Sequence, residues 1–158
     1  GSADIGIVAG KPASSELEYI PYRQDRLVLV APIDHPLSGL SEVAFSDTLS
    51  FEYVGLSEWS AIHAFLIQAA DKLGYPFRFR VEVGSFEAVC RMIEAGVGIG
   101  VVPELVAKRY AQRLKINIVR LSDEWSERKL QICVRNLQQL PSFTKDLVNM
   151  LIEDVPVV

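Results

Sequence analysis

Gly84 to Pro103 has the sequence GSFEAVCRMIEAGVGIGVVP, which predicts a helix, a buried strand and the start of a second helix. Ser85 is placed to cap the first helix and Gly96 to end it. Four apolar residues share one face of this helix at helical spacing: Phe86, Val89, Cys90 and Ile93. Val97 to Val102 is a continuous apolar run, typical of a strand covered on both faces. Pro103 suits the first position of the next helix, where a missing N–H costs nothing.

Segments on both sides of this stretch continue the alternation of strands and helices. The other predicted strands cover residues 3–8, 17–22, 27–33, 51–56, 77–83, 116–121 and 130–134. A helix over residues 62–73 has Ser57 and Ser60 as candidate N-caps, and a last helix begins at Pro141. This last helix is expected to turn four residues inward: Phe143, Leu147, Met150 and Leu151. The alternation predicts an α/β fold with mainly parallel sheets.

The composition narrows the class of protein. Of the 158 residues, 49% are apolar and 23% are charged, which excludes disorder for the bulk of the chain. No apolar run approaches the length of a membrane span. The net charge of −4, from 16 basic and 20 acidic residues, argues against a nucleic-acid-binding surface within this chain. Cys90 and Cys133 lie in apolar patterns and are expected to be reduced core thiols of a cytoplasmic protein.

The residues that could carry catalysis or bind a metal form no recognisable constellation. The glycines at 96, 98 and 100 complete no dinucleotide fingerprint, and they enter a strand instead of following one. His35 and His63 have no ligand-spaced partners around them. Only three carboxylates lie near the predicted site: Glu58, Glu82 and Glu87. We therefore expect no enzyme, no metal and no cofactor.

One basic cluster stands out in the sequence. It consists of Lys108, Arg109, Arg113 and Lys115. Favourable charge at the C-terminal end of the helix that begins near Pro103 is the preferred interpretation, and a nucleic-acid patch is the alternative.

Two strand-to-helix junctions are the best candidates for a binding site. They lie at residues 56–60 and 84–86. Ligands of parallel α/β sheets gather beyond the carboxyl ends of the strands, and free N–H groups and hydroxyls there suit an anion such as a carboxylate. The alternative is that Ser57, Ser60 and Ser85 are only helix caps. Trp59 is either an aromatic wall of the site or a packing residue.

Three stretches resemble a known family, in that family's order. They are ADIGI at residues 3–7, LVLVAP at 27–32 followed by HPL at 35–37, and GSFEAV at 84–89 followed by IEAGVGIGVVP at 93–103. Over nearly its whole length the chain resembles the effector-binding (regulatory) domain of LysR-type bacterial transcription regulators. The third stretch is the most specific of the three.

This resemblance implies a fold like that of type-2 periplasmic binding proteins, with an inducer in the cleft between two α/β lobes. The crossovers between lobes are expected near residues 23–26 and 121–123. Residues 25–119 would form the second lobe, and residues 1–24 with 120–158 would form an incomplete first lobe. Together, the helix starts and the resemblance give the candidate ligand-binding residues: Leu56, Ser57, Trp59, Ser60, Ser85, Phe86, Val102 and Pro103.

The resemblance also implies the role and the partners. We expect the ligand-sensing module of a cytoplasmic regulator that binds a small anionic metabolite and contacts DNA only through an N-terminal helix-turn-helix absent from this sequence. A dimer or tetramer is expected in the parent protein, with no membrane partner. Self-association is expected through exposed apolar surface of the lobe that contains residues 4–8 and 130–152. The alternatives are a solute-binding protein of a transport system and an enzyme on the same fold.

Overall fold

The computed structural model describes residues 3–10 and 14–153. The chain forms two compact units, Gly1–Asp25 with Glu127–Val158 (unit 1) and Arg26–Ser126 (unit 2). The long strand β2 (Glu18–Pro32) contributes residues to both units. The two runs predicted as separate strands are therefore one strand, because the polar residues between them continue the extended backbone.

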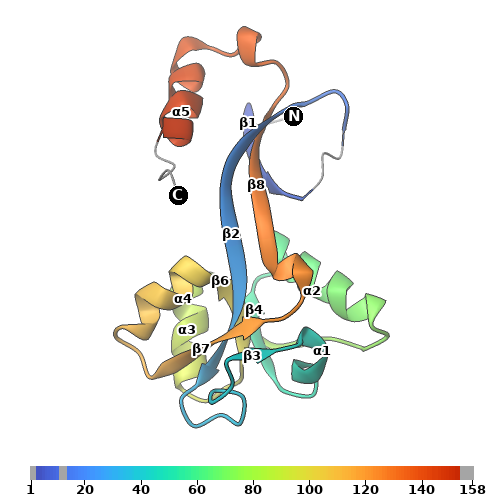
Figure 1. Cartoon of the computed structure of the whole chain (residues 1–158), viewed down its shortest axis with the longest axis vertical. Coiled ribbons are helices and arrows are strands. Elements are labelled where there is room, and N and C mark those ends of the chain that lie inside the picture. The colour runs from blue at the N-terminus through green and yellow to red at the C-terminus, as the bar shows by residue number, and fades with distance from the viewer. Residues whose placement is uncertain (1–2, 11–13, 154–158) are drawn as a thin grey trace. The chain divides into compact units, whose positions relative to one another are not determined.

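Unit 2 carries most of the regular elements (Figure 1). In chain order they are β3 (Glu42–Val43), α1 (Phe45–Thr48), β4 (Tyr53–Leu56), α2 (Ala61–Lys72), β5 (Phe79–Val83), α3 (Phe86–Glu94), β6 (Gly100–Pro103), α4 (Glu104–Ala111), β7 (Ile116–Leu121) and a 3-10 turn (Glu124–Ser126). No helix in the described parts of the chain is long and apolar enough to cross a membrane.

The second half of β2 is the centre of unit 2. It pairs antiparallel with both β6 and β7, and Leu29 lies opposite Val101 on one side and Val119 on the other. Side chains of Leu27 and Leu29 pack with one core cluster, and Val28 and Val30 with another, so helices and loops cover both faces. All of Leu27 to Ala31 is fully buried, as the continuous apolar run predicts.

The sheets are mixed, which corrects the expectation of mainly parallel ones. β3 pairs parallel with β7, and β4 pairs parallel with β5, whereas both partners of β2 in unit 2 run antiparallel to it. β6 and β7 are joined by the single helix α4, and because both run antiparallel to β2, they run parallel to each other with β2 between them. The strand–helix–strand pattern therefore predicts the parallel direction of β6 and β7 but not the direction of β2, which no single helix joins to either strand.

Unit 1 contains β1 (Ile5–Ala9), the first part of β2, β8 (Glu127–Val134), a 3-10 turn (Leu137–Gln139) and α5 (Ser142–Glu153). β8 lies between β1 and β2, and its Ile132 and Val134 form a small core with Val148 of α5. An ion pair between Arg128 of β8 and Asp25 of β2 joins the two strands near the boundary of the unit.

The expected inner face of α5 is wrong for three of its four residues. Phe143, Leu147 and Met150 are 72%, 49% and 65% exposed, whereas Leu151 is partly buried against the core. Thr144 and Val148 are the buried residues of this helix. Residues 144, 148 and 151 share the same i, i+4, i+7 spacing as residues 143, 147 and 150, so periodicity alone supports either face.

Candidate functional site

Three strands of unit 2 end at the same edge. β4 and β5 run parallel with Leu56 opposite Val83. The segment leading into β6 runs parallel to β4 as well: the Val54 N–H donates to the Ile99 carbonyl at 2.8 Å, and the Ile99 N–H to the Glu52 carbonyl at 2.9 Å. The helices α2, α3 and α4 follow β4, β5 and β6 directly, so all three helices begin at this edge.

Glycines make the close approach of β4 and β6 possible. A Cβ on Gly98 would lie 2.3 Å from the Glu52 carbonyl oxygen, and one on Gly100 would lie 2.7 Å from that of Val54. The tightest neighbour of both positions is backbone, and the Ile93 side chain of α3 lies 3.1 Å from a Cβ on Gly100 as well. Gly96 has a φ of 75° and follows the end of α3, as predicted from its position.

The start of α2 is built from two serines with different roles. Ser60 is the N-cap, and its Oγ accepts a hydrogen bond from the His63 N–H at 3.0 Å. Ser57 lies in the preceding loop, where its N–H donates to the Val83 carbonyl at 3.1 Å and joins this loop to the end of β5. Within the described residues, the N–H groups of Ala61 and Ile62 have no acceptor.

The start of α3 repeats this arrangement. Ser85 is the N-cap, and its Oγ accepts from the Ala88 N–H at 3.2 Å. The N–H groups of Phe86 and Glu87 point out of the first turn with no acceptor among the described residues. Since a serine oxygen that accepts a hydrogen bond still has its own O–H, both capping hydroxyls can donate to a ligand.

The start of α4 differs from the sequence expectation. Pro103 is the last residue of β6 and the N-cap of α4, so the helix begins one residue later than predicted. No side chain caps this helix.

The predicted site residues fall at this edge with unequal exposure. Leu56, Ser57, Ser60, Phe86 and Pro103 are partly buried, and Ser85 is exposed. Trp59 is 89% exposed and packs little in this structure. Val102 is 0% exposed, and its side chain lies in the core cluster beneath α3 and α4. The structure therefore places these residues at the carboxyl ends of β4, β5 and β6 or in the segments that follow them, with Val102 turned into the core.

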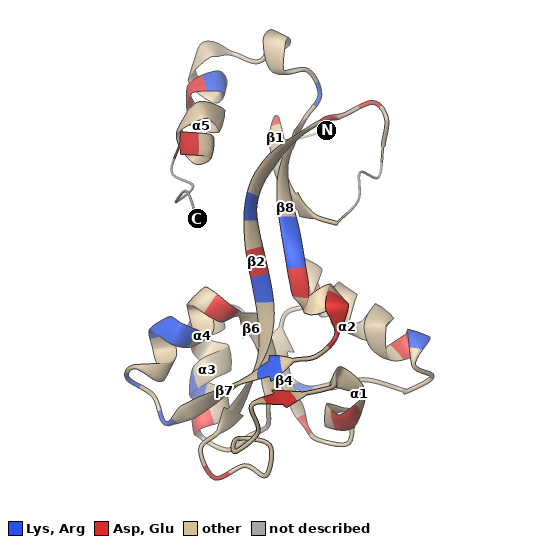
Figure 2. Cartoon of the chain, in the orientation of Figure 1, with Lys and Arg blue, Asp and Glu red and all other residues tan. Residues whose placement is uncertain are grey.

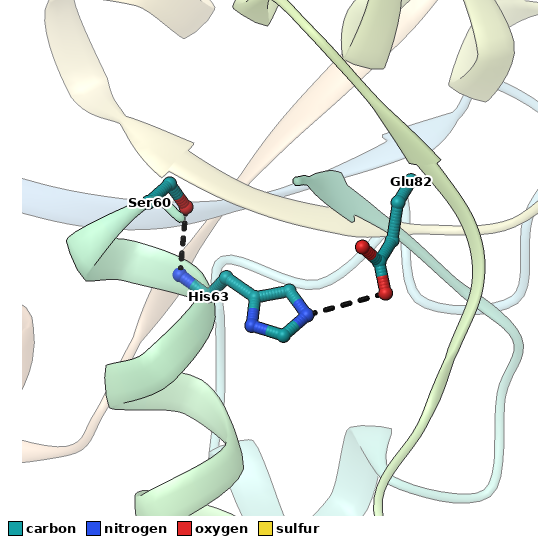
Figure 3. Close-up of polar contacts among 3 residues, drawn as sticks. All are labelled: Ser60, His63 and Glu82. Carbon is teal, nitrogen blue, oxygen red and sulfur yellow. Dashed lines mark hydrogen bonds and ion pairs between the residues drawn. The ribbon is translucent and has the colours of Figure 1, made fainter. Parts of the chain in front are cut away.

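One polar pair at this edge was not predicted (Figure 3). His63, in the first turn of α2, is 7% exposed, and its Nε2 lies 3.3 Å from Oε1 of Glu82 on β5. Its ring stacks on Phe79 with 4.6 Å between the ring centroids. The two residues are 19 positions apart, and only the parallel β4–α2–β5 arrangement brings them together.

Two other carboxylates near the helix starts form ion pairs within their own helices. Glu87 pairs with Arg91 at 3.0 Å, and Glu104 pairs with Lys108 at 2.9 Å. Lys108 and Arg109 lie in the last turn of α4, where basic residues are visible in Figure 2, and there they complement the helix dipole. In the parts of the chain that the structure describes, no group of three or more His, Cys, Asp or Glu side chains could hold a metal ion.

The cysteine beneath the site has the environment of a structural thiol. Burial raises the pKa of Cys90 to about 11, and its side chain packs in the core cluster under α3. A thiol with a raised pKa is a poor nucleophile at neutral pH.

The chain belongs to the family of LysR substrate binding domains, whose family model matches residues 1–156. Among the relatives it matches are two regulators. It is 27% identical over 128 residues to "HTH-type transcriptional regulator CysL" of Bacillus subtilis, covering 81% of this chain and 43% of that protein. It is 31% identical over 148 residues to "Uncharacterized HTH-type transcriptional regulator MJ0300" of Methanocaldococcus jannaschii, covering 92% and 50%. The chain thus spans half or less of the length of these relatives.

Solved structures show the same fold. The regulatory domain of Synechocystis CcmR, in complex with 2-PG, superposes with a TM-score of 0.80 at 24% identity, covering 96% of this chain and 73% of that one. The regulatory domain of MetR from N. meningitidis superposes with a TM-score of 0.81 at 16% identity, covering 98% and 73%. The predicted fold class, an α/β fold like that of type-2 periplasmic binding proteins, is confirmed.

Proposed function

We propose that this chain is the effector-sensing domain of a LysR-type, DNA-binding transcription regulator, and that it binds a small anionic metabolite where β4, β5 and β6 end. The observation that carries the proposal is the convergence of three helix N-termini at one edge of unit 2. The family supports the sensing role. Known structures with this fold hold small ligands, namely 2-PG in CcmR and shikimate in QuiR.

Helix N-termini favour an anion because their free N–H groups and the helix dipole both present positive charge. At α2 and α3 those groups are the N–H groups of residues 61, 62, 86 and 87, supplemented by the hydroxyls of Ser60 and Ser85. Arg91 and Lys108, in the last turns of α3 and α4, are paired with carboxylates of their own helices. We expect the site to recognise a ligand mainly through the N–H and O–H donors of the helix starts.

The proposal extends to the rest of the regulator. Ligand binding would shift the population of two arrangements of the sensing domain, and the oligomer would pass that shift to a DNA-binding segment outside this sequence. Self-association through the exposed apolar residues of α5 and a cytoplasmic location belong to the same proposal. That a second lobe closes over the ligand stays a prediction.

A ligand screen tests the proposed site. Small carboxylates and phosphorylated metabolites are added to the chain, and binding is detected by a rise in melting temperature. The affinity of each hit is then measured on Ser57→Ala and on a matched control, Ser41→Ala, which changes an exposed serine just before β3, away from the ends of β4, β5 and β6. We expect weaker binding in Ser57→Ala and unchanged binding in Ser41→Ala. Equal affinity in both variants would place the ligand elsewhere.

A further inference from the structure

An open hollow lies at the amino ends of β4 and β5, the edge opposite the proposed effector site. Residues 49–52 form one wall and residues 76–80 form the other. The two walls meet because Tyr53 lies opposite Phe79 in the parallel pair, so the residues just before each strand are neighbours. At about 3.3 Å per residue, the four residues of β4 put about 13 Å between this hollow and the effector edge.

Two arginines line this hollow. Arg78 and Arg80 are both exposed, and they alternate with Phe77 and Phe79, whose side chains pack against the core. Arg80 is the extra residue of a β-bulge, because Tyr53 lies opposite Phe79 and Val54 opposite Val81, and both arginines line the hollow. In the described residues neither arginine has an ion pair or a hydrogen-bond partner. Both guanidinium groups are therefore available to a ligand.

The charge of the hollow is positive despite one acidic residue. Glu52 lines it too, but its carboxylate forms no ion pair with a described residue. Two arginines against one glutamate leave one net positive charge. A guanidinium group binds a phosphate or carboxylate through two parallel hydrogen bonds, and two such groups facing one hollow can share the oxygens of a single phosphate.

We propose that this hollow is a second small-molecule site that binds a phosphate group through Arg78 and Arg80. It lies at the other end of the strands from the effector site, so neither proposal depends on the other.

The two arginines have an alternative explanation. β5 pairs only with β4 among the described residues, and charge on such an edge strand also hinders pairing with another chain. That protective role predicts no saturable binding of phosphate, which separates the two interpretations.

The test uses the 158-residue chain and inorganic phosphate at constant ionic strength. Backbone amide shifts are followed by NMR during the titration. We expect saturable shifts confined to residues 49–52 and 76–80, with the affinity lowered at least about tenfold in the double variant Arg78→Gln/Arg80→Gln, because both charge-assisted forks are lost. The matched control, Arg109→Gln/Arg113→Gln, removes two exposed arginines of the α4 region and should bind phosphate as the unchanged chain does.

Two results would overturn the proposal. One is a set of non-saturating shifts spread equally over the hollow and the α4 arginines, which indicates general ion screening. The other is unchanged affinity in the folded Arg78→Gln/Arg80→Gln variant. Arg78→Lys/Arg80→Lys is a second variant that keeps the charge but loses the planar fork, and its affinity should fall between those of the unchanged chain and the glutamine variant. A melting temperature close to that of the unchanged chain would show that the lysine variant is folded.

Discussion

The Nε2 atom of His63 lies 3.3 Å from Oε1 of Glu82, which joins the first turn of α2 to strand β5. The same turn is held from the other side by Ser60, whose Oγ accepts from the His63 backbone N–H. The His63 ring therefore links the first turn of α2 to β5, whereas the cap uses only the backbone N–H of residue 63. The hydrogen bond from the Ser57 N–H to the Val83 carbonyl is a second link between this helix start and β5.

We predict that packing of the His63 ring contributes more to stability than its polar contact with Glu82. The ring is buried and stacked on Phe79, whereas the side chain of Glu82 is 42% exposed, so water can replace its contact with the ring. Glu82→Gln should change the free energy of unfolding by less than about 1 kcal/mol. His63→Ala should cost about 2 to 3 kcal/mol through the cavity it leaves. Urea unfolding measures both, and a larger loss in Glu82→Gln would contradict this order.

A negative charge placed at the helix caps should weaken anion binding without loss of stability. Aspartate caps a helix about as well as serine, but its carboxylate repels an anion at the N-terminus. We expect Ser60→Asp and Ser85→Asp to keep the melting temperature and to weaken an anionic effector by tenfold or more.

The alanine variants at the same positions separate capping from binding. Ser60→Ala and Ser85→Ala should each lower stability by about 1 kcal/mol, because the cap hydrogen bond is lost. Calorimetric titration with the effector identified by the screen measures affinity in all four variants. Unchanged affinity in both aspartate variants would exclude the anion site at these helix starts.

The close approach of β4 and β6 predicts a strong effect at Gly98. A Cβ there would meet backbone at 2.3 Å, and backbone cannot rotate away as a side chain can. Gly98→Ala should therefore lower the free energy of unfolding by about 1 to 3 kcal/mol. Gly39→Ala is the matched control, because nothing lies within 4 Å of the point its methyl group would occupy, and its effect should be close to zero. Chemical denaturation checks the pair, and equal effects would mean that the strands do not approach as closely as described.

Local sequence signals predicted the elements around the site well. Ser85, Gly96 and the apolar spacing of α3 each act over eight residues or fewer, and the structure confirms all of them. Signals of this kind cannot determine how distant strands pair. β2 and β7 pair antiparallel although their residues are about ninety positions apart, and no residue near either strand indicates that direction.

The candidate site was predictable in outline for the same reason. Strand-to-helix junctions are local, so the sequence located the starts of α2, α3 and α4 to within a residue. The His63–Glu82 pair depends on the parallel register of β4 and β5, which no local pattern encodes. The burial of Val102 depends on which face α3 and α4 cover, which is likewise set by tertiary packing.

Stability should fall as the pH drops, in part because of His35. Burial lowers the pKa of His35 below its ordinary value of 6.5. Its Nδ1 accepts a hydrogen bond from the Leu37 N–H at 3.2 Å, and protonation would remove that acceptor. The unfolded chain therefore takes up a proton near pH 6.5 more readily than the folded chain does, so folding loses stability as the pH falls below about 6.5.

Asparagine at position 35 tests this contribution. Its side-chain oxygen can accept from the N–H two residues on but does not titrate. We expect the stability of His35→Asn to depend less on pH between about 7 and 5.5 than that of the unchanged chain. Denaturant unfolding at a series of pH values gives the comparison, and identical slopes in the two proteins would remove His35 as a cause.

The exposed stripe of α5 should drive self-association of this chain. Phe143, Leu147 and Met150 lie on one face of the helix and are largely exposed, while Val148 on the other face holds the helix to the core. Burial of such side chains in a second copy would release about 25 cal/mol for each Å² of apolar surface. Phe143→Ser/Met150→Ser should shift sedimentation velocity towards the monomer and leave the melting temperature nearly unchanged. Val148→Ala is the matched comparison. It should lower the free energy of unfolding by about 1 to 3 kcal/mol and have no direct effect on association. A chain that stays monomeric at millimolar concentration would contradict the prediction, because its apolar stripe would then have no tendency to be covered by a second copy.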